Sequence, residues 1–209
     1  MPEQLLIINI MLSVVIQAGG ESRRMGQDKG LLLLLGQPLI ARVMARVASL
    51  ADEVLVTTNH PEAYRFLGVP LFEDVYPGTG ALGGLYTALT VARHPLVAVV
   101  ACDMPFASPE ILAAARERLL EAEVDVVIPQ SEDGYEPFHA VYRRDICLPA
   151  VKDALEAGER RLISWFPAVK VATLSAEEAS RLDPLKLAFW NLNTPEELQQ
   201  AEQMARLIQ

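Results

Sequence analysis

Residues 14–30 read VVIQAGGESRRMGQDKG, and this stretch decides the fold of the chain. It continues an apolar run, Leu12–Gln17, which stops before Gly19 and Gly20 and gives way to a polar and basic loop. A short continuous apolar run that ends at turn residues predicts a strand buried on both faces. Strands of that kind are typical of sheets covered by helices on both sides, so we expect an α/β protein.

Strands and helices alternate along the rest of the chain, as judged from apolar runs and from the helical spacing of apolar residues. The predicted strands are Leu12–Gln17, Glu53–Thr58, Val69–Phe72, Leu96–Ala101, Val124–Pro129, Glu136–Tyr142, Val169–Leu174 and Lys186–Trp190. The predicted helices are Pro38–Leu50, Pro61–Leu67, Ala81–Ala92, Pro109–Ala122, Ile146–Ala157 and Pro195–Leu207. Ser108 and Thr194 are expected to cap the helices that follow them, each of which has proline at its first position.

This alternation predicts a three-layer sandwich with a mostly parallel central sheet and helices on both faces. Ligands of such sheets bind beyond the carboxyl ends of the strands. Polar segments follow the first four predicted strands, and they read AGGESRRMGQDK, TTNH, ED and CDMP. We therefore expect these four segments to meet in one crevice.

Composition limits the classes of function. The 209 residues carry a formal net charge of −9 and a pI of about 4.9, which argues against a general nucleic-acid binder or a membrane-surface protein, since both need a basic face. Two widely spaced cysteines, Cys102 and Cys147, do not make a disulfide framework, so we expect reduced thiols in a cytoplasmic protein.

The apolar run Leu5–Ile16 is shorter than the about 20 residues of a membrane span. We expect residues 1–10 to be a short, disordered N-terminal extension and residues 11–209 to form a single domain.

The glycine-rich loop has the chemistry of an anion site. Gly19 and Gly20 let the backbone approach a ligand closely and present its N–H groups to it. Arg23, Arg24 and Lys29 add positive charge, and a nucleoside triphosphate needs this combination. Of the two arginines, we expect Arg24 to point toward the phosphates. The loop is neither a Walker A sequence nor a Rossmann fingerprint, because no Gly-Lys-Ser/Thr follows the two glycines.

The longer string IQAGGESRRMGQDKGLLLLLGQPLI, residues 16–40, strongly resembles the signature of the molybdenum cofactor guanylyltransferases, the MobA family of molybdopterin nucleotidyltransferases. The resemblance runs from Met11 over nearly the whole chain and includes EDVYPGTGALGGL, ACDMPF, EPFHAVY, GERRLISWF and WNLNTPEEL. It implies a Rossmann-like nucleotidyltransferase domain of the nucleotide-diphospho-sugar transferase type. It also implies transfer of GMP from GTP to the phosphate of molybdopterin, with formation of molybdopterin guanine dinucleotide and release of pyrophosphate.

The resemblance implies roles for the residues that match the family's motifs. Ala18, Gly19 and Gly20 would contact the nucleotide, Lys29 would bind its phosphates, Asp74 would contact the nucleoside and Asp103 would hold Mg²⁺. A carboxylate at the end of a buried strand is costly to desolvate without a cation, and Mg²⁺ takes one or two carboxylates together with phosphate oxygens and waters. Lys29, Arg24 and Asp103 are the expected catalytic residues, because transfer between two anionic groups depends on positioning and on stabilisation of charge.

Three positions depart from the family's pattern. Gln17 stands where leucine is usual, Thr57 where some members carry asparagine, and Ala81 replaces a common proline. Gln17, Thr57 and the retained Asn59 are expected to contact the nucleotide, but the first two leave the choice of base open. A cytidylyltransferase that makes the cytosine dinucleotide form of the cofactor from CTP is therefore the alternative.

The pterin side is expected at three further segments. The residues are Gly83 and Gly84 in GALGGL, Arg160 and Arg161 in GERRL, and Asn191 and Asn193 in WNLN. Amides can match the donors and acceptors of a pterin edge, and arginines can bind its phosphate. Structural interpretations compete with these roles: close helix–sheet packing for the glycines, a solvated helix face for the arginines, and a capping box of Thr194 and Glu197 for part of the last segment.

Two further side chains are expected to be structural. His139, between Phe138 and Ala140, is expected to be a packed strand residue rather than a catalyst, and Cys102 a packed neighbour of Asp103. We also find no arrangement of Ser, His and Asp that would predict a catalytic triad, and no cysteine-rich metal site.

A second class of function stays open at this point, namely a carrier that binds nucleotide and cofactor without turnover. Lys29 and Asp103 argue against it, because a pure binder does not need a metal held at the α-phosphate.

The expected partners are GTP and molybdopterin as substrates. The resemblance also leaves room for transient contact with other cofactor-biosynthesis proteins or with recipient molybdoenzymes, and we expect no nucleic acid and no membrane.

Overall fold

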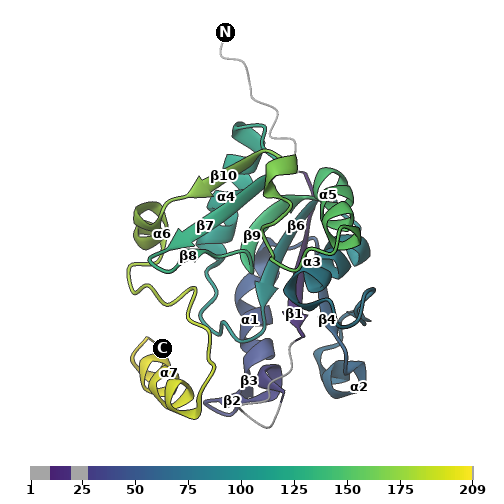
Figure 1. Ribbon diagram of the computed structural model, residues 1–209. Helices are drawn as coiled ribbons and strands as arrows, with labels where there is room; N and C mark the ends of the chain where they lie inside the picture. The colour runs from purple at the N-terminus through teal and green to yellow at the C-terminus, as the bar shows by residue number, and fades with distance from the viewer. Residues whose placement is uncertain (1–9, 20–27, 209) are drawn as a thin grey trace.

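The computed structural model describes residues 10–19 and 28–208, and one sheet forms its centre (Figure 1). The strands are β1 Leu12–Ala18, β4 Glu53–Thr58, β5 Leu71–Phe72, β6 Leu96–Ala101, β7 Val126–Ser131, β8 Gly134–Tyr135, β9 His139–Arg143 and β10 Val171–Leu174. They are ordered β10-β7-β9-β6-β1-β4-β5, and β8 pairs with β7. All neighbouring pairs are parallel except those that involve β8 or β9. The mostly parallel sheet expected from the sequence is confirmed.

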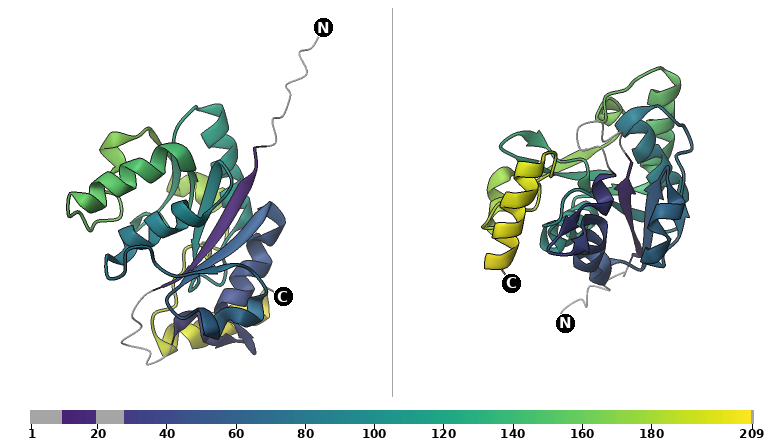
Figure 2. Two further views of the ribbon diagram at one scale, coloured as in Figure 1. Left: turned by 90° about the vertical axis from the view of Figure 1, so that its right-hand side faces the viewer. Right: turned by 90° about the horizontal axis from the view of Figure 1, so that it is seen from below.

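Helices cover both faces of this sheet. The α-helices are α1 Leu39–Val47, α2 Pro61–Tyr64, α3 Gly80–Val91, α4 Pro109–Glu121, α5 Arg144–Glu156, α6 Ala176–Leu182 and α7 Pro195–Leu207. The 3₁₀ helices are η1 Lys29–Leu31, η2 Ala48–Leu50, η3 Arg65–Leu67 and η4 Phe166–Ala168. Helices α1, α4 and α6 pack on one face and α3 and α5 on the other, so the protein is a three-layer sandwich (Figure 2).

Alternation along the strands sends side chains into two separate cores. In β1, Val14 and Ile16 pack against α1 and α4, whereas Val15 packs against α3 and α5. Every residue of β1 is buried. A strand covered on both faces has no solvent side, which is why five of its seven residues are apolar and point to both faces.

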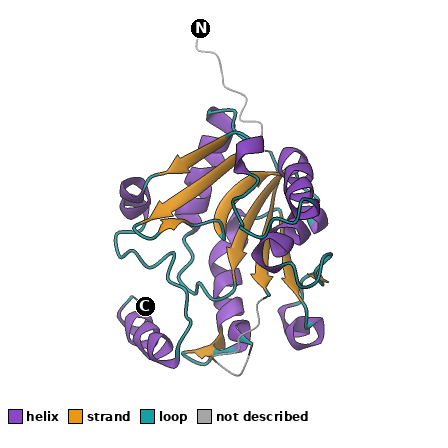
Figure 3. Cartoon of the chain, in the orientation of Figure 1, coloured by secondary structure: helices purple, strands orange, loops and turns teal. Residues whose placement is uncertain are grey.

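A third, smaller core lies beyond the carboxyl ends of the central strands. The two-stranded hairpin of β2, Leu33–Leu34, and β3, Gln37–Pro38, packs with α7 through Leu34, Leu192 and Ala201. Figure 3 shows the arrowheads of the central strands pointing toward the edge where the hairpin and α7 lie. The segment that leads into α7 is thereby held close to η1, Lys29–Leu31.

The predicted strand Lys186–Trp190 is wrong, because this segment is a turn without strand pairing. Leu187 and Ala188 are buried, and their burial explains the strand-like pattern. The Asp183 carboxylate accepts the Ala188 N–H at 2.6 Å, and Lys186 has a positive φ of 53°, so the backbone is held in a local turn. The hairpin, β8 and α6 were not predicted, since each is short.

The predicted caps are confirmed. Ser108 Oγ accepts the Ile111 N–H at 3.2 Å at the start of α4, and Thr194 and Glu197 form the capping box of α7. None of the described helices is long and apolar enough to cross a membrane. The expected N-terminal extension lies, except for Ile10, outside the described residues.

Candidate active site

A short turn after the glycine-rich loop positions Lys29. Asp28 caps η1: its carboxylate accepts the Gly30 N–H at 3.1 Å and also the hydroxyl of Tyr64, a fully buried residue of α2. Burial, followed by the hydrogen bond to Asp28, raises the pKa of the Tyr64 hydroxyl, so this group stays protonated as a donor. The backbone from which the Lys29 side chain extends is therefore fixed to the buried core.

Lys29 joins two distant parts of the chain. Its ammonium group donates to Asp103 Oδ2 at 2.8 Å and to Asn193 Oδ1 at 2.5 Å. The side chains of Lys29 and Asp103 are 23% and 15% exposed, so the pair is largely shielded but reachable from solvent. Asp103 follows β6, and its backbone carbonyl accepts the Leu192 N–H at 3.0 Å, which ties the C-terminal segment to this end of the sheet.

A cavity of about 270 Å³ opens beside this pair. The residues that line it include Gln17, Ala18, Gly19, Lys29, Asp103 and Asn191. A Cβ on Gly19 would meet no atom of the described residues within 4 Å, so they leave room for a ligand beside this backbone. The segments after β1 and β6 thus meet as predicted. The expected nucleotide contact Gly20 and the expected catalytic residue Arg24 lie outside the described residues.

Gln17 brings an unpaired amide to this cavity. Its side chain is 8% exposed, and its Nε2 atom has no hydrogen-bond partner among the described residues. A Cβ on Gly84 of α3 would lie 3.2 Å from this amide, so the helix approaches the side chain closely. Buried polar groups are normally paired, and an unpaired donor at a cavity wall is a group that a ligand can satisfy.

The segments after β4 and β5 meet each other instead. Asn59 Nδ2 donates to Asp74 Oδ2 at 2.9 Å, and the Asp74 N–H donates to Asn59 Oδ1 at 3.3 Å. Asn59 is exposed and Asp74 is half-buried, and neither lines the 270 Å³ cavity. Thr57 is buried and lies in register with Gln17 on the neighbouring strand. The single crevice expected from the sequence is therefore formed by two of the four polar segments, with the other pair at the ends of the adjacent strands.

Packing accounts for the two glycines of α3. A Cβ on Gly83 would lie 1.7 Å from Thr79 Oγ1, and Gly84 is covered by Gln17 as described. Arg160 and Arg161 are exposed and line neither of the two cavities described here. Of the expected pterin-side residues, all of which are described, the two asparagines of WNLN are those that the fold brings to Lys29 and its cavity.

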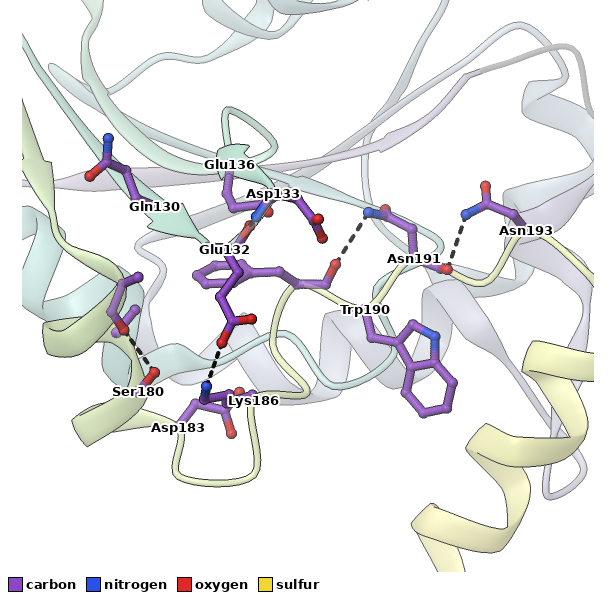
Figure 4. A pocket seen from close by; sticks show the side chains of 14 residues that line it. Gln130, Glu132, Asp133, Glu136, Ser180, Asp183, Lys186, Trp190, Asn191 and Asn193 are labelled. Carbon is purple, nitrogen blue, oxygen red and sulfur yellow. Dashed lines mark hydrogen bonds and ion pairs between the residues drawn. The ribbon is translucent and has the colours of Figure 1, made fainter.

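A second cavity, of about 470 Å³, lies next to the first. Asn191 lines both cavities, so they share a wall. Figure 4 shows Glu132, Asp133 and Glu136 grouped on the side formed by the end of β7 and the turn after it, with Asn191 and Asn193 on another side. The two cavities together offer one compartment beside Lys29 and a roomier one beyond it.

His139 and Cys102 are structural, as expected. His139 is fully buried, and burial lowers its pKa to about 4, so the ring is neutral. Its Nε2 atom lies 3.1 Å from the Ser108 carbonyl, which can only accept, so Nε2 carries the proton. Cys102 is 7% exposed, and burial raises the pKa of its thiol.

Asp103 is the described residue that fits a magnesium ion best. Its carboxylate faces a cavity lined by groups suited to phosphate, and Mg²⁺ combines one or two carboxylates with phosphate oxygens and waters. One oxygen of Asp28, the other carboxylate at this cavity, is engaged by Gly30 and Tyr64. Among the described residues no group of three or more His, Cys, Asp or Glu side chains is arranged for a metal. The remaining ligands would have to come from the substrate and water.

Asp28, Gly30 and Tyr64 are the site residues that sequence reasoning missed. Asp28 stands one position before Lys29, and a short polar residue there is a typical capping signal, so it could have been found. Tyr64 could not, because nothing in the sequence of its short helix distinguishes it from a tyrosine that only packs in the core. Its link to Asp28 appears only when α2 is placed beside the loop.

Gly30→Ala is expected to destabilise the protein by about 1–3 kcal/mol, because the added Cβ would overpack a filled site. That Cβ would lie 2.6 Å from Tyr64 Oη and 3.3 Å from Cys102 Sγ. Relief of the clash moves Tyr64 or the turn, so we also expect turnover to fall several-fold. Urea unfolding and steady-state rates measure both effects.

Tyr64→Phe provides the matched control for this prediction. It removes the hydroxyl that the new methyl group would meet first, so the double variant Gly30→Ala/Tyr64→Phe should be less destabilised than the sum of the two single variants. Strict additivity of the two changes would contradict the proposed clash.

The chain matches known proteins over most of its length. The MobA-like NTP transferase domain matches residues 14–172. A protein of Pelotomaculum thermopropionicum named probable molybdenum cofactor guanylyltransferase is 37% identical over 192 residues, which cover 91% of this chain and 92% of that protein. The crystal structure of molybdopterin-guanine dinucleotide biosynthesis protein A from Archaeoglobus fulgidus matches with a TM-score of 0.80 and 25% identity, over 93% of this chain and 99% of that one. The 2-C-methyl-D-erythritol 4-phosphate cytidylyltransferase of Thermus thermophilus matches with a TM-score of 0.68 and 20% identity over 94% and 100% of the two chains, a likeness in fold alone.

Proposed function

The chain belongs to the family of the MobA-like NTP transferase domain, and from this premise we propose that it transfers GMP from GTP to the phosphate of molybdopterin. The products are molybdopterin guanine dinucleotide and pyrophosphate. The observation that carries the proposal is the pair of Lys29 and Asp103, which face each other at 2.8 Å beside a cavity that begins at Gly19. The Lys29 ammonium group and the Gly19 backbone suit the phosphates of a triphosphate, and the Asp103 carboxylate suits its metal ion.

Each member of the pair has its own task in this reaction. The Lys29 ammonium is a compact charge that would bind non-bridging phosphate oxygens and stabilise the charge that develops on the departing pyrophosphate. Asp103 would hold Mg²⁺, which when bound neutralises the triphosphate and orients it. Lys29 and Asp103 form an ion pair, so Lys29 would exchange Asp103 for phosphate when GTP binds. Arg24 stays a predicted catalytic residue.

The nucleotide side of the site is proposed from the same geometry. Ala18, Gly19 and Gly20 would contact the nucleotide through their backbone. Gln17 and Thr57, adjacent in register, would lie near the base, with the unpaired Gln17 amide as the group that the base satisfies. Asn59 and Asp74 would have to exchange their mutual hydrogen bonds for the nucleoside.

The acceptor would lie beyond Lys29, in the larger cavity. Asn191 lines both cavities, and Asn193 contacts Lys29 directly, so these two amides stand between the donor and acceptor compartments. A phosphate placed there would be within the field of Lys29 while its organic part occupies the 470 Å³ space. Gly83, Gly84, Arg160 and Arg161 receive no support from this placement.

Pyrophosphate release with GTP, CTP and ATP tests the proposed function. With molybdopterin and Mg²⁺ present, GTP should be preferred over CTP by at least about tenfold, which corresponds to about 1.4 kcal/mol of discrimination. Omission of molybdopterin is the control for hydrolysis. Preference for CTP would mean that Gln17 and Thr57 select cytosine and would replace the guanylyltransferase with its cytidylyltransferase alternative. Nucleotide binding without any release of pyrophosphate would favour the carrier.

We place the reaction in the cytoplasm, where the two buried thiols of Cys102 and Cys147 would stay reduced. GTP and molybdopterin are the proposed partners. The acidic sequence, with a net charge of −9, does not favour nucleic acid as a third. Transient handover to other cofactor-biosynthesis proteins or to a recipient molybdoenzyme stays a prediction.

A further inference from the structure

The larger cavity has a polarity that its proposed use as an acceptor compartment does not explain. An acceptor that carries a phosphate is an anion, yet four carboxylates line this cavity, those of Glu132, Asp133, Glu136 and Asp183. Lys186 is the lysine that lines it, and its ammonium is paired with Glu132 at 2.7 Å. A phosphate group would be repelled from this wall, so the part of the acceptor that enters here must be neutral and rich in hydrogen-bond donors.

The carboxylates differ in how fully their own neighbours engage them. Glu132 is exposed and paired with Lys186, and Asp183 accepts the Ala188 N–H at 2.6 Å, which holds the turn after α6. Asp133 is exposed to water. Glu136 is half-buried, and no lysine or arginine among the described residues forms an ion pair with it. Of the four carboxylates, Glu136 is therefore the one that a hydrogen-bond donor from a ligand would stabilise most.

The electrostatics of Glu136 support this distinction. Burial raises the pKa of its carboxyl group, the Ser131 hydroxyl opposes this effect through a hydrogen bond, and the nearby Asp133 adds to it. A desolvated carboxylate without a cation is unfavourable unless donors replace the lost water. Figure 4 shows Glu136 on the same wall as Asp133, within the set of residues around the cavity.

We propose that Glu136 is the residue that selects the acceptor ring, by accepting two hydrogen bonds from the 2-amino group and the neighbouring ring N–H of a pterin. This inference rests on the proposed function, since it assumes that the acceptor is a pterin with a phosphate. The 2-amino-4-oxopyrimidine edge presents two adjacent donors, and the two oxygens of a carboxylate match such a pair.

The rest of the cavity suits the body of such a ring. Its volume of about 470 Å³ falls within the range of small-molecule sites, about 300–1,000 Å³. Phe189 and Trp190 contribute aromatic surface to the lining, and Ala176 and Ala179 contribute small apolar side chains. With the ring held at Glu136, the phosphate end would extend past Asn191 toward Lys29, because Asn191 is shared by the two cavities.

The decisive experiment compares two rings that differ at the proposed contact. 6-Hydroxymethylpterin carries the 2-amino group, and 6-hydroxymethyllumazine has an oxygen in its place, which would face the carboxylate as a second acceptor. Equilibrium dialysis with the intrinsic fluorescence of the rings gives both dissociation constants. We expect the parent protein to bind the pterin about 10- to 100-fold more tightly than the lumazine, and Glu136→Gln to lose most of this preference.

Glu132→Gln is the matched control, because Glu132 lines the same cavity but is exposed and paired with Lys186. It should keep the preference for the pterin. Equal binding of the two rings by the parent protein, binding of neither, or an unchanged preference in Glu136→Gln would overturn the proposal. A rise in the dissociation constant for GTP in Glu136→Gln would also overturn it, because Glu136 would then belong to the nucleotide side.

The proposed function has a separate readout. Pyrophosphate release by the parent protein with GTP and molybdopterin does not depend on discrimination between the two free rings. Release with no ring preference would leave the guanylyltransferase in place and overturn the role of Glu136. A preference for the pterin ring without any release of pyrophosphate would keep the role of Glu136 and overturn the guanylyltransferase.

Discussion

Asp103→Asn is expected to lower kcat by on the order of 10²- to 10³-fold, the loss typical when one charge-stabilising group is removed from an active site. Asparagine keeps the shape of the side chain, and its amide oxygen can still accept from the Lys29 ammonium, now 2.8 Å from the carboxylate. The pocket should therefore stay folded. The variant lacks the negative charge that would hold Mg²⁺, and the triphosphate would lose its oriented counter-ion.

Pyrophosphate release over a titration of Mg²⁺ measures this effect. We expect the variant to need a higher Mg²⁺ concentration for half-maximal rate, in addition to its lower kcat. Asp153→Asn, at an exposed position of α5, is the matched control for loss of one acidic charge. An Asp103→Asn protein with the parent's rate and Mg²⁺ dependence would remove Asp103 from the metal site.

Lys29→Met is the second substitution with a large expected effect. It removes the cation that would bind the phosphates, so kcat/KM for GTP should fall by on the order of 10²- to 10³-fold. It also leaves the Asp103 carboxylate, 15% exposed, without its ion-pair partner. Loss of one member of a shielded pair is costly because the other charge stays desolvated. Lys29→Arg should recover part of the loss, since arginine keeps the charge but places it on a broader, planar group.

The effect of Mg²⁺ on the Tm of Lys29→Met distinguishes a specific loss of the phosphate-binding cation from a general loss of structure. Mg²⁺ alone should raise the Tm of Lys29→Met more than that of the parent, because no ammonium competes for Asp103. Lys152→Met, which removes an exposed lysine paired with Glu156 on α5, is the control and should respond as the parent does. An equal Tm response in all three proteins would argue that Asp103 does not bind the ion.

The bounds of an element were predictable from the sequence where a buried apolar run or a helix cap marked them. The strands Glu53–Thr58 and Leu96–Ala101 and the helix Pro195–Leu207 have the bounds that the sequence predicted. Leu96–Ala101 and the centre of Glu53–Thr58 are apolar because helices cover the sheet on both sides, and the helix begins at a capping box. Lys186–Trp190 failed for a reason that periodicity cannot detect. Its apolar residues are buried, but a side chain upstream, Asp183, ties the backbone into a turn.

The site was predictable only to the level of segments. Polar residues at the carboxyl ends of parallel strands indicated where Lys29 and Asp103 would lie, and they do form a pair. The contact between Lys29 and Asn193 spans 164 positions and depends on the course of the irregular segment before α7. No local pattern encodes such a course. Glu136 was missed for a related reason, since its distinction is that no described lysine or arginine forms an ion pair with it in a cavity that exists only in the fold.

The bond between Lys29 and Asn193 also has a consequence for the order of events during synthesis. A ribosome synthesises the sheet strands from β1 to β9 well before it reaches residue 193. The nascent chain can therefore assemble its core early, as domains do during translation. The Asn193 contact to Lys29 can form only once the segment around Asn193 has been made, so the growing chain should stay catalytically silent until then.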